Sequence, residues 1–571
     1  MALVLRVSTN YCPLLSTLYC KFTVNITRFK SNKLSSYHLK NNNDTILIRK
    51  EYANIRTCNE TIAFRQTQAH KSILVQLKSI DDVSHLKNYC KEFGNISSIY
   101  HYSTLADDPN FVLIEFESVC SVEEIKRTSE CRNSSEHIYM DTRVLWFQRK
   151  RNKNSQSHLS MLQESSGFPL HSMSIPTTKM IQKRLHPIRN VSEQMVELYN
   201  ILRFTDIDVR LRFYTADQLQ SCISKLFPTI SIIPFGSSIS GFGHTGCDLD
   251  LVCRNIHKNA RINDSLNKLV FHAKYYSMNE KSHQQKLLSI VADIIQNFIP
   301  GIYNIERILG ARVPIIKFVN KYTTMRCDLS NTNIVASHMT EVLFYYGEMD
   351  WRVKPLVCTI RKWARSVRIT NEIPGVWLTN FSLTLLVIFY LQYKNVLPTI
   401  NKLVASVGNQ KFKVIHPQNL DLNRNKTTEA ESLYSLLYGF FEFYVTFQFS
   451  THGMCLREGR YKLKADNSAV YIFNPFEPSL NVSRNVNMNE LHHMIKEFRT
   501  ALLRLENEEN GLEDLFNLPK ASVLKSVIQN IDVKRDSSKT NTEKQFESTN
   551  EELLTNETNI GDANKLKGII K

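Results

Sequence analysis

The sequence lacks the cysteine spacings on which zinc sites and disulfide frameworks depend. Its 12 cysteines are scattered over 571 residues, and no two of them form a Cys-x-x-Cys pair. His244 and Cys247 lie close together, but no second Cys/His pair follows with the spacing of a zinc site. The pattern therefore argues against a zinc site, and scattered thiols of this kind suit a reducing compartment.

The sequence also lacks an apolar run long enough to cross a bilayer. The most apolar stretch, residues 378–391, is interrupted by Thr, Asn and Ser, whereas a membrane-spanning helix needs about 20 mostly apolar residues. Because the stretch would be apolar nearly all round a helix, it predicts a helix buried in a protein core. We therefore expect no membrane span.

Acidic residues are missing from the first 43 positions. This segment contains six Lys or Arg and no Asp or Glu, and it is rich in Ser, Thr and Asn. Such a start resembles a mitochondrial transit peptide, which predicts a transit peptide over residues 1–43 and localisation in the mitochondrial matrix. At the other end, residues 530–571 are polar with a single aromatic residue, Phe546, which predicts a disordered tail.

The body of the chain carries an excess of basic residues. The net charge is +17, and six of these charges belong to residues 1–43, which leaves +11. Residues 532–571 hold seven Lys or Arg against eight Asp or Glu, so the excess does not lie in the tail. A basic body favours a polyanionic partner, although charge alone does not separate RNA from a membrane surface.

The most informative stretch is residues 235–250, which read Phe-Gly-Ser-Ser-Ile-Ser-Gly-Phe-Gly-His-Thr-Gly-Cys-Asp-Leu-Asp. On a strand, alternate side chains share a face, so Asp248 and Asp250 are expected to point the same way. Two adjacent carboxylates repel each other unless a cation lies between them. Mg²⁺ prefers oxygen ligands and shares them with substrate phosphates. The backbone N–H groups of Gly236 and Ser237 suit a phosphate, so the stretch predicts Mg²⁺ (or Mn²⁺) beside a bound nucleotide.

A third carboxylate follows in a second pair of expected strands. Residues 313–319 and 322–330 are rich in apolar and β-branched residues with a short polar turn between them. Asp328 is expected at the end of the second strand. An isolated Asp there would be taken for an ordinary strand end, but two-metal phosphoryl transfer needs a third ligand. Together with Asp248 and Asp250, Asp328 is therefore predicted to be catalytic and to bind metal.

With these residues the chain resembles the polymerase-beta-like nucleotidyltransferase superfamily, in its branch of noncanonical poly(A) polymerases and terminal uridylyltransferases. Within that branch it is most similar to the mitochondrial poly(A) polymerases. The resemblance covers roughly residues 185–510 and rests on Gly246-Cys-Asp-Leu-Asp250, Cys327-Asp-Leu329, Ile360-Arg-Lys-Trp-Ala-Arg365, Pro374-Gly-Val-Trp-Leu-Thr-Asn-Phe-Ser382 and Asn474-Pro-Phe-Glu477.

The resemblance implies further nucleotide-binding residues. Arg361 and Arg365 stand four residues apart in a segment of helical spacing, residues 341–366, where relatives often carry phosphate-binding lysines. Asn380 and Phe381 stand where relatives commonly have Ser-Tyr, so Phe381 is expected to stack on the base and Asn380 to bind phosphate or sugar. Asn333 resembles the family's ribose-contacting asparagine. The structural alternatives are a solvated basic helix face for the arginines, and helix packing or capping for the others.

An α+β fold with several domains is predicted. Residues 60–150 show a βαββαβ order that resembles an RNA-recognition motif, with Phe111 at a base-stacking position but Leu74 and Leu113 where aromatics are expected. We therefore expect a docking or dimerisation module. A linker (151–184), a catalytic palm with a mixed sheet (185–345) and a helical poly(A)-polymerase-associated domain (346–520) follow.

The resemblance implies an enzyme, a polynucleotide adenylyltransferase. It would add AMP from ATP to RNA 3′ ends of mitochondrial transcripts without a template, by a two-metal mechanism, and would act as a homodimer. Two alternatives stay open. A terminal uridylyltransferase would use the same three aspartates, although no histidine stands between residues 465 and 490 to favour UTP. A non-catalytic RNA-binding scaffold would keep the fold without the chemistry.

Overall fold

The structure is a computed structural model of the chain. It describes residues 56–104, 110–130, 142–148, 170–172, 175–255, 272, 279–331, 333–373, 375–405, 431–506 and 511–516. All of these residues belong to one compact unit, which begins at Arg56. The predicted transit peptide (1–43) and tail (530–571) lie outside the described residues.

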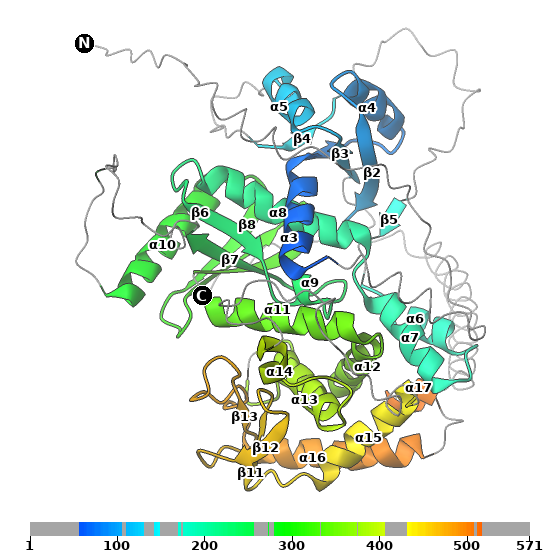
Figure 1. The fold of residues 1–571 in the computed structure, drawn as a ribbon. Helices are drawn as coiled ribbons and strands as arrows, with labels where there is room; N and C mark the ends of the chain where they lie inside the picture. Colours follow the sequence, from blue (N-terminus) through cyan, green and yellow to red (C-terminus); the bar gives the residue numbers. More distant parts are fainter. Residues whose placement is uncertain are drawn as a thin grey trace, which may run out of the picture. The chain divides into compact units, whose positions relative to one another are not determined.

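The first sheet has five strands in the order β4-β1-β3-β2-β5 (Figure 1). Its elements are β1 (Ser72–Leu77), α4 (Asp82–Lys91), β2 (Ile96–Ser103), β3 (Asn110–Phe116), α5 (Val119–Thr128), β4 (Val144–Trp146) and β5 (Leu170–Ser172). The predicted βαββαβ order is found from β1 to β4. The fifth strand comes from the predicted linker and pairs in parallel with β2, because an open sheet edge offers unpaired backbone groups to an extended segment.

The two faces of this sheet pack against different partners. Helices α4 and α5 cover one face, with a core that includes Val83, Leu86 and Val122. The other face packs onto the palm. There Tyr102 and Phe111 are 0% and 3% exposed, the Tyr102 hydroxyl donates to the Tyr322 carbonyl at 2.8 Å, and the Phe111 and Tyr322 rings lie 5.9 Å apart. The face that would stack RNA bases is therefore buried within the chain.

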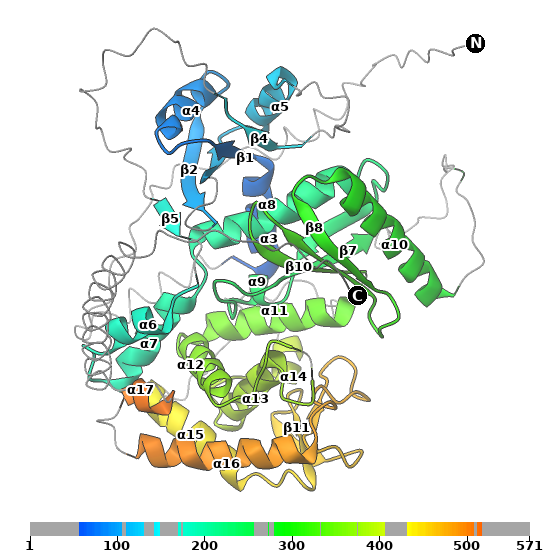
Figure 2. The ribbon, with the colours of Figure 1, turned by 180° about the vertical axis from the view of Figure 1, so that it is seen from behind.

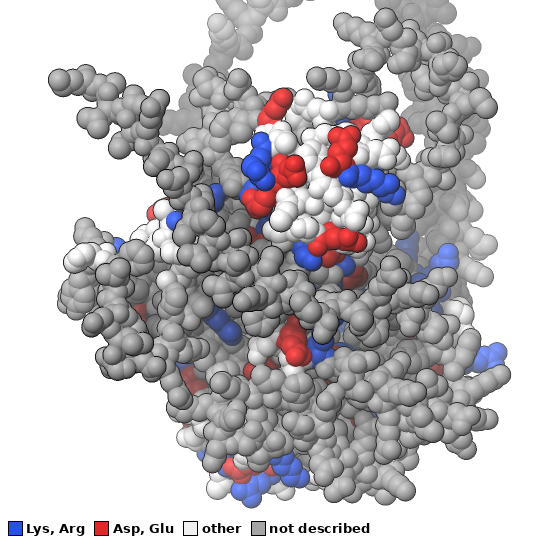
Figure 3. All heavy atoms as spheres, turned by 45° about the horizontal axis from the view of Figure 1, so that its top comes forward, with Lys and Arg blue, Asp and Glu red and all other residues white. Residues whose placement is uncertain are grey.

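Among the residues that the structure describes, the outer side of the same region does not offer a basic surface for RNA either. Figure 3 brings this side forward and shows acidic side chains interspersed with basic ones. Of the described residues in the α4–α5 region, the exposed basic ones are Lys78, Lys91 and Arg127, and the exposed acidic ones are Asp81, Glu92, Glu117, Glu123, Glu124 and Glu130. This balance favours a docking role for the region, because phosphate binding depends on clustered Lys and Arg.

We expect Phe111→Ala to lower stability rather than RNA affinity. Emptying a fully buried Phe site costs about 3–5 kcal/mol, and Phe111 packs where the first sheet meets the palm. Thermal unfolding would show the loss, while the KM for RNA of the folded variant should match that of the wild type. Tyr89→Ala, at a side chain that is 40% exposed on the other side of the sheet, is the control. A Phe111→Ala protein of normal stability and weaker RNA binding would contradict the docking role.

The palm contains a second five-stranded sheet in the order β6-β7-β10-β9-β8. Its strands are β6 (Ile230–Pro234), β7 (Leu249–Asn255), β8 (Ile302–Ile308), β9 (Ile315–Asn320) and β10 (Met325–Asn331). Strands β7 and β10 pair in parallel, whereas the other pairs are antiparallel, so the sheet is mixed as predicted. Helices α8 (Asp206–Ile223) and α10 (Glu280–Phe298) share a core with the alternate residues Leu249, Leu251, Cys327 and Leu329. The residues between them on β7 and β10 therefore face away from this core.

Figures 1 and 2 show the remaining described helices, which share a second large core. They are α3 (Cys58–His70), α6 (Thr178–Leu185), α7 (Val191–Leu202), α9 (Ser237–Ser240), α11 (Ile334–Met349), α12 (Val353–Ser366), α13 (Asn380–Tyr393), α14 (Ile400–Ala405), α15 (Leu433–Thr446), α16 (Met488–Leu505) and α17 (Gly511–Leu515). A small sheet, β12-β11-β13, joins them, with β11 (His452–Cys455), β12 (Arg460–Leu463) and β13 (Ile472–Phe473). Helix α13 is buried over most of its length, as predicted. Of the described helices, none has both the length and the apolar character needed to cross a membrane.

Two segments differ from the sequence-based expectation. Residues 341–366 are not one helix, because α11 ends at Met349 and Asp350 takes an extended conformation before α12 begins. The Asp350 carboxylate binds the Arg352 guanidinium at this break, a local interaction that periodicity does not reveal. The predicted linker also contains α6, whose first turn is capped by Thr177.

Candidate functional site

The three predicted aspartates lie at neighbouring positions of the palm sheet. Asp250 on β7 stands directly opposite Asp328 on β10 in the parallel register, and Asp248 immediately precedes β7. Asp328 lies in the middle of β10 rather than at its end, because the strand continues to Asn331 beside β7. Asp250 and Asp328 therefore share the sheet face that points away from α8 and α10.

The electrostatics of the cluster favour a bound cation. Burial, together with the negative charges of Asp328 and Asp248, raises the pKa of Asp250 to about 7, while Arg212 and Lys317 act in the opposite direction. A carboxyl group held half-buried beside two others is costly to ionise unless positive charge compensates. Three carboxylates also form the hard oxygen donor set that Mg²⁺ and Mn²⁺ prefer, so the residues fit a divalent cation.

Two basic side chains that are not among the predicted site residues form ion pairs with Asp328 and Asp248. Lys317 Nζ lies 2.6 Å from Asp328 Oδ2, and Arg326 Nε lies 2.9 Å from Asp248 Oδ1. Among the described residues, no three His, Cys, Asp or Glu side chains converge on one point as metal ligands, since these two carboxylates are turned toward their basic partners. Joint coordination of one ion thus requires an exchange of partners. Lys317 could have been found from the β9–β10 hairpin register, in which it faces Asp328.

The Gly-Ser turn lies against the aspartates. Gly236 has φ +64° and ψ −136°, a conformation that favours glycine, and a Cβ on it would approach Asp250 Oδ2 to 2.5 Å. The Gly236 N–H donates to Thr340 Oγ1 at 2.9 Å, so in this arrangement that amide is already used within the protein. Ser237 begins the short helix α9, and its Oγ lies 3.4 Å from Cys247 Sγ.

Arg212, on α8, connects the Gly-Ser turn to the aspartates and is not among the predicted site residues. It is 2% exposed. Its guanidinium donates to Ser238 Oγ at 2.9 Å, to the Asp248 carbonyl at 3.0 Å and to the Cys247 carbonyl at 2.5 Å, and it stacks on the Phe204 ring at 4.2 Å. No motif marks it, because an arginine within a helix gives no sign of burial.

The two predicted phosphate-binding arginines differ in their surroundings. Arg361 donates to Thr384 Oγ1 from Nε and Nη2 at 3.0 and 2.6 Å, and to the Phe242 carbonyl at 2.5 Å, and burial lowers its pKa to about 10. Arg365 is exposed and pairs with Glu372 at 2.8 Å. Arg361 thus joins α12 and α13 to the loop after the Gly-Ser turn, whereas Arg365 lies at the surface.

The other predicted nucleotide contacts occupy helix starts. Asn333 caps α11, with its Oδ1 accepting from the Ala336 N–H at 3.2 Å, so the capping alternative describes its role in this conformation. Asn380 is the first residue of α13 and is exposed. Phe381 follows it and is 38% exposed, which leaves part of its ring accessible for stacking.

The Asn474-Pro-Phe-Glu477 segment reaches from the helical region to the palm. Glu477 Oε1 binds Arg312 Nη2 at 2.6 Å, and the Phe476 ring lies 5.3 Å from the His338 ring on α11. Asn474 Oδ1 accepts from the Phe476 and Glu477 N–H groups at 3.0 and 3.2 Å, which fixes the turn. The Asn474-Pro-Phe-Glu477 segment is therefore linked both to the palm and to α11.

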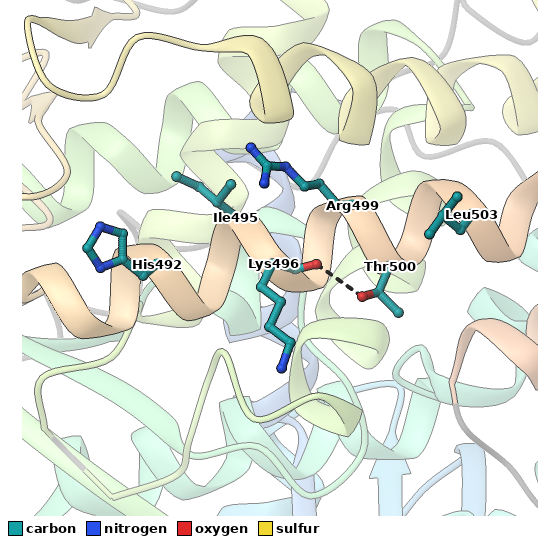
Figure 4. A pocket seen from close by; sticks show the side chains of 6 residues that line it. All are labelled: His492, Ile495, Lys496, Arg499, Thr500 and Leu503. Atoms are coloured by element: carbon teal, nitrogen blue, oxygen red, sulfur yellow. Dashed lines mark hydrogen bonds between the residues drawn. The ribbon is translucent and has the colours of Figure 1, made fainter.

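A surface depression of about 380 Å³ lies along α16. Figure 4 shows its six side chains along this helix, with the Thr500 hydroxyl donating to the Lys496 carbonyl. The lining residues are His492, Ile495, Lys496, Arg499, Thr500 and Leu503. None of them is a predicted site residue, and all six lie on α16 rather than on the strands that carry the aspartates.

Comparison with known proteins decides the family. Residues 191–348 match a family model described as the central palm domain of mitochondrial-like poly(A) RNA polymerase. The mitochondrial poly(A) RNA polymerase of Drosophila melanogaster is 34% identical over 499 residues, which cover 82% of this chain and 81% of the relative. The chain belongs to the mitochondrial poly(A) RNA polymerase family. The Homo sapiens member is 30% identical over 457 residues, covering 78% and 76% of the two chains.

Solved structures of this family agree with the fold. A crystal structure of mtPAP in complex with ATPγS is 29% identical, covers 81% of this chain and 99% of its own, and gives a TM-score of 0.72. A complex of mtPAP with UTP gives the same identity and TM-score. The predicted α+β nucleotidyltransferase fold is confirmed. The predicted enzyme class, a polynucleotide adenylyltransferase that needs no template, is confirmed as that of the family.

Proposed function

We propose that the chain uses ATP to add AMP to the 3′ ends of mitochondrial RNAs in the matrix, with Mg²⁺ or Mn²⁺ held by Asp248, Asp250 and Asp328. The observation that carries this proposal is the pairing of Asp250 with Asp328 on adjacent strands, beside the Gly236-Ser237 turn.

A divalent cation in this cluster would supply positive charge to the α-phosphate and lower the pKa of the attacking 3′-hydroxyl. The chain's own residues supply position. The parallel register fixes Asp250 against Asp328, and Arg212 fixes Asp248 against the turn by donating to its carbonyl. Such fixed geometry accounts for much of the rate that positioning contributes.

The nucleotide would be bound by residues from three helices and the turn. Gly236, Ser237 and Arg361 would hold the triphosphate, and Arg365 would add positive charge from the surface. Phe381 would stack on the base, while Asn333 and Asn380 would bind ribose or phosphate through their amides. For Gly236 and Asn333 this requires their present partners, Thr340 and the Ala336 N–H, to share or release them.

The domain boundaries and the oligomeric state are part of the proposal. Residues 60–150 would form the RRM-like domain, 151–184 the linker, 185–345 the palm and 346–520 the helical domain. We also propose a homodimer, which rests on the resemblance to the mitochondrial poly(A) polymerases.

The test is extension of a labelled RNA oligonucleotide by the full chain with Mg²⁺, each nucleotide being supplied alone. A ladder with ATP is expected, and Asp248→Ala should lower the rate at least a hundredfold, since loss of one metal carboxylate raises the barrier by about 3 kcal/mol. Asp293→Ala is the matched control, because Asp293 is an exposed carboxylate paired with Arg307 at 2.6 Å, as Asp248 is paired with Arg326. Preference for UTP would indicate a uridylyltransferase, and RNA binding without extension would indicate a scaffold.

A further inference from the structure

The loop between the Gly-Ser turn and Asp248 presents a histidine in a fixed position. His244 is exposed over part of its surface, and its Nδ1 lies 3.0 Å from the Thr245 carbonyl. The loop is anchored next to this ring through Thr245. The Thr245 N–H donates to the Leu202 carbonyl at 3.1 Å, and the Thr245 hydroxyl donates to Asp208 at 3.1 Å. His244 also forms an isolated backbone bridge with Arg203.

One face of α12 runs beside this loop and carries basic residues. Lys354 is close to Gly241 and pairs with Glu348 at 2.5 Å. Arg361 donates to Thr384 and to the Phe242 carbonyl, as described above. Lys362 is different, because no hydrogen bond or ion pair to another described residue engages its amine. It is half-buried and lies close enough to Arg365 to be affected by that charge.

The basic groups around His244 and Lys362 are close enough to change the pKa values of these two side chains. Restricted solvation lowers the pKa of His244, and the charges of Arg361, Arg212 and Lys362 lower it further, against the effect of its hydrogen bond to Thr245. Burial likewise lowers the pKa of Lys362. Placing several cations together in a partly enclosed site is unfavourable for the free protein, and a bound anion would relieve it.

We propose that His244 and Lys362 bind the terminal phosphates of ATP and the pyrophosphate product, with His244 taking up a proton as the anion binds. The proposal rests on the nucleotide site of the proposed function. Its position supports phosphate rather than base, since the same short loop joins Gly236 and Ser237 to Asp248 and touches Arg361. With Nδ1 donating to the Thr245 carbonyl, Nε2 is the atom that takes a proton from solvent and donates to a phosphate oxygen.

The sign of the pH dependence follows from the charges around the ring. In the free protein, imidazolium formation is opposed by Arg361 and Lys362 of α12 and by Arg212 of α8, with Arg203 on the adjoining backbone. A phosphate dianion reverses that balance and raises the pKa of His244. Phosphate affinity contributed by His244 therefore increases as pH falls through the bound-state pKa, and is lost at higher pH.

The experiment measures KM for ATP, kcat and inhibition by inorganic pyrophosphate with the full chain between pH 6 and 8.5. We expect His244→Gln to raise both the KM for ATP and the inhibition constant for pyrophosphate roughly three- to tenfold at pH 6, the scale of one charge-assisted hydrogen bond. The difference from the wild type should shrink by pH 8.5. His244→Lys should match the wild type at pH 6 and bind more tightly at pH 8.5.

Lys362→Met should weaken ATP and pyrophosphate binding at every pH, with little change in the KM for RNA. His492→Gln and Lys496→Met, at exposed positions of α16, are the matched controls and should behave as the wild type. Suppose that the wild type extends RNA with ATP, and that His244→Gln and Lys362→Met have the same KM for ATP and the same inhibition by pyrophosphate as the wild type. This result would overturn the inference and leave the proposed function standing. A wild type that does not use ATP would overturn the proposed function instead. A rise in the KM for RNA without a change for pyrophosphate would also overturn the inference.

Discussion

Asp250→Asn is expected to lower RNA extension at least a hundredfold and, at the same time, to make the metal-free protein more stable at pH 8. The first effect follows from loss of a metal-binding carboxylate at a cost of about 3 kcal/mol in the barrier. The second follows from the pKa of Asp250, which is raised from 3.8 to about 7. Asparagine keeps the shape of the side chain and removes the charge that Asp328 and Asp248 oppose.

The pKa values of Asp250 in the folded and unfolded states set the pH range of this stability effect. The folded state holds the Asp250 proton up to about pH 7, whereas the unfolded chain releases it near pH 4. Stability of the wild type without metal should therefore fall as pH rises from about 4 to above 7. Thermal unfolding in a chelator should show Asp250→Asn above the wild type at pH 8 and close to it at pH 5. Asp293→Asn, at a surface ion pair, should change neither activity nor this profile. An Asp250→Asn protein that is destabilised at pH 8 would contradict the repulsive cluster.

The three aspartates could be identified from the sequence, but their positions relative to one another could not. The spacing of Gly236-Ser237 and Asp248-Leu-Asp250 is local, and strand alternation alone places Asp250 opposite the buried leucines. That Asp328 stands beside Asp250 depends on the parallel pairing of β7 with β10, two strands with α10, β8 and β9 between them in the chain. Register between distant strands is set by the packing of both faces, which a single sequence does not display.

The interaction partners of the site side chains could not be predicted from the sequence either. The helical spacing of Arg361 and Arg365 predicts a shared face, yet Arg361 is held by Thr384 and the Phe242 carbonyl while Arg365 pairs with Glu372. Arg212 and Lys317 contact the site from elements that carry no motif. Phe111 was placed at a base-stacking position by strand order, and only the packing of the sheet onto the palm shows that Tyr322 covers it.

Gly236→Ala is expected to lower extension strongly, because this glycine lies directly against Asp250. A Cβ at this position would lie 2.5 Å from Asp250 Oδ2 and 3.3 Å from its Cγ. The short Asp250 side chain, fixed by β7, cannot withdraw without leaving its position beside Asp328. We expect a rate at least about a hundredfold lower, comparable to loss of a carboxylate, together with a loss of stability from the strained backbone at φ +64°.

Gly241→Ala separates the effect of the contact with Asp250 from the effect of backbone strain. Gly241 also has a positive φ, +81°, so an alanine there carries a left-handed backbone penalty of about 1–2 kcal/mol. Its Cβ would meet Lys354 Cε at 2.9 Å, the far part of a flexible side chain that can move aside. Both variants should unfold at a lower temperature, but only Gly236→Ala should lose activity per folded molecule. If both variants lost activity in proportion to their loss of stability, backbone strain alone would explain why position 236 needs a glycine. Contact with Asp250 would then not be needed as an explanation.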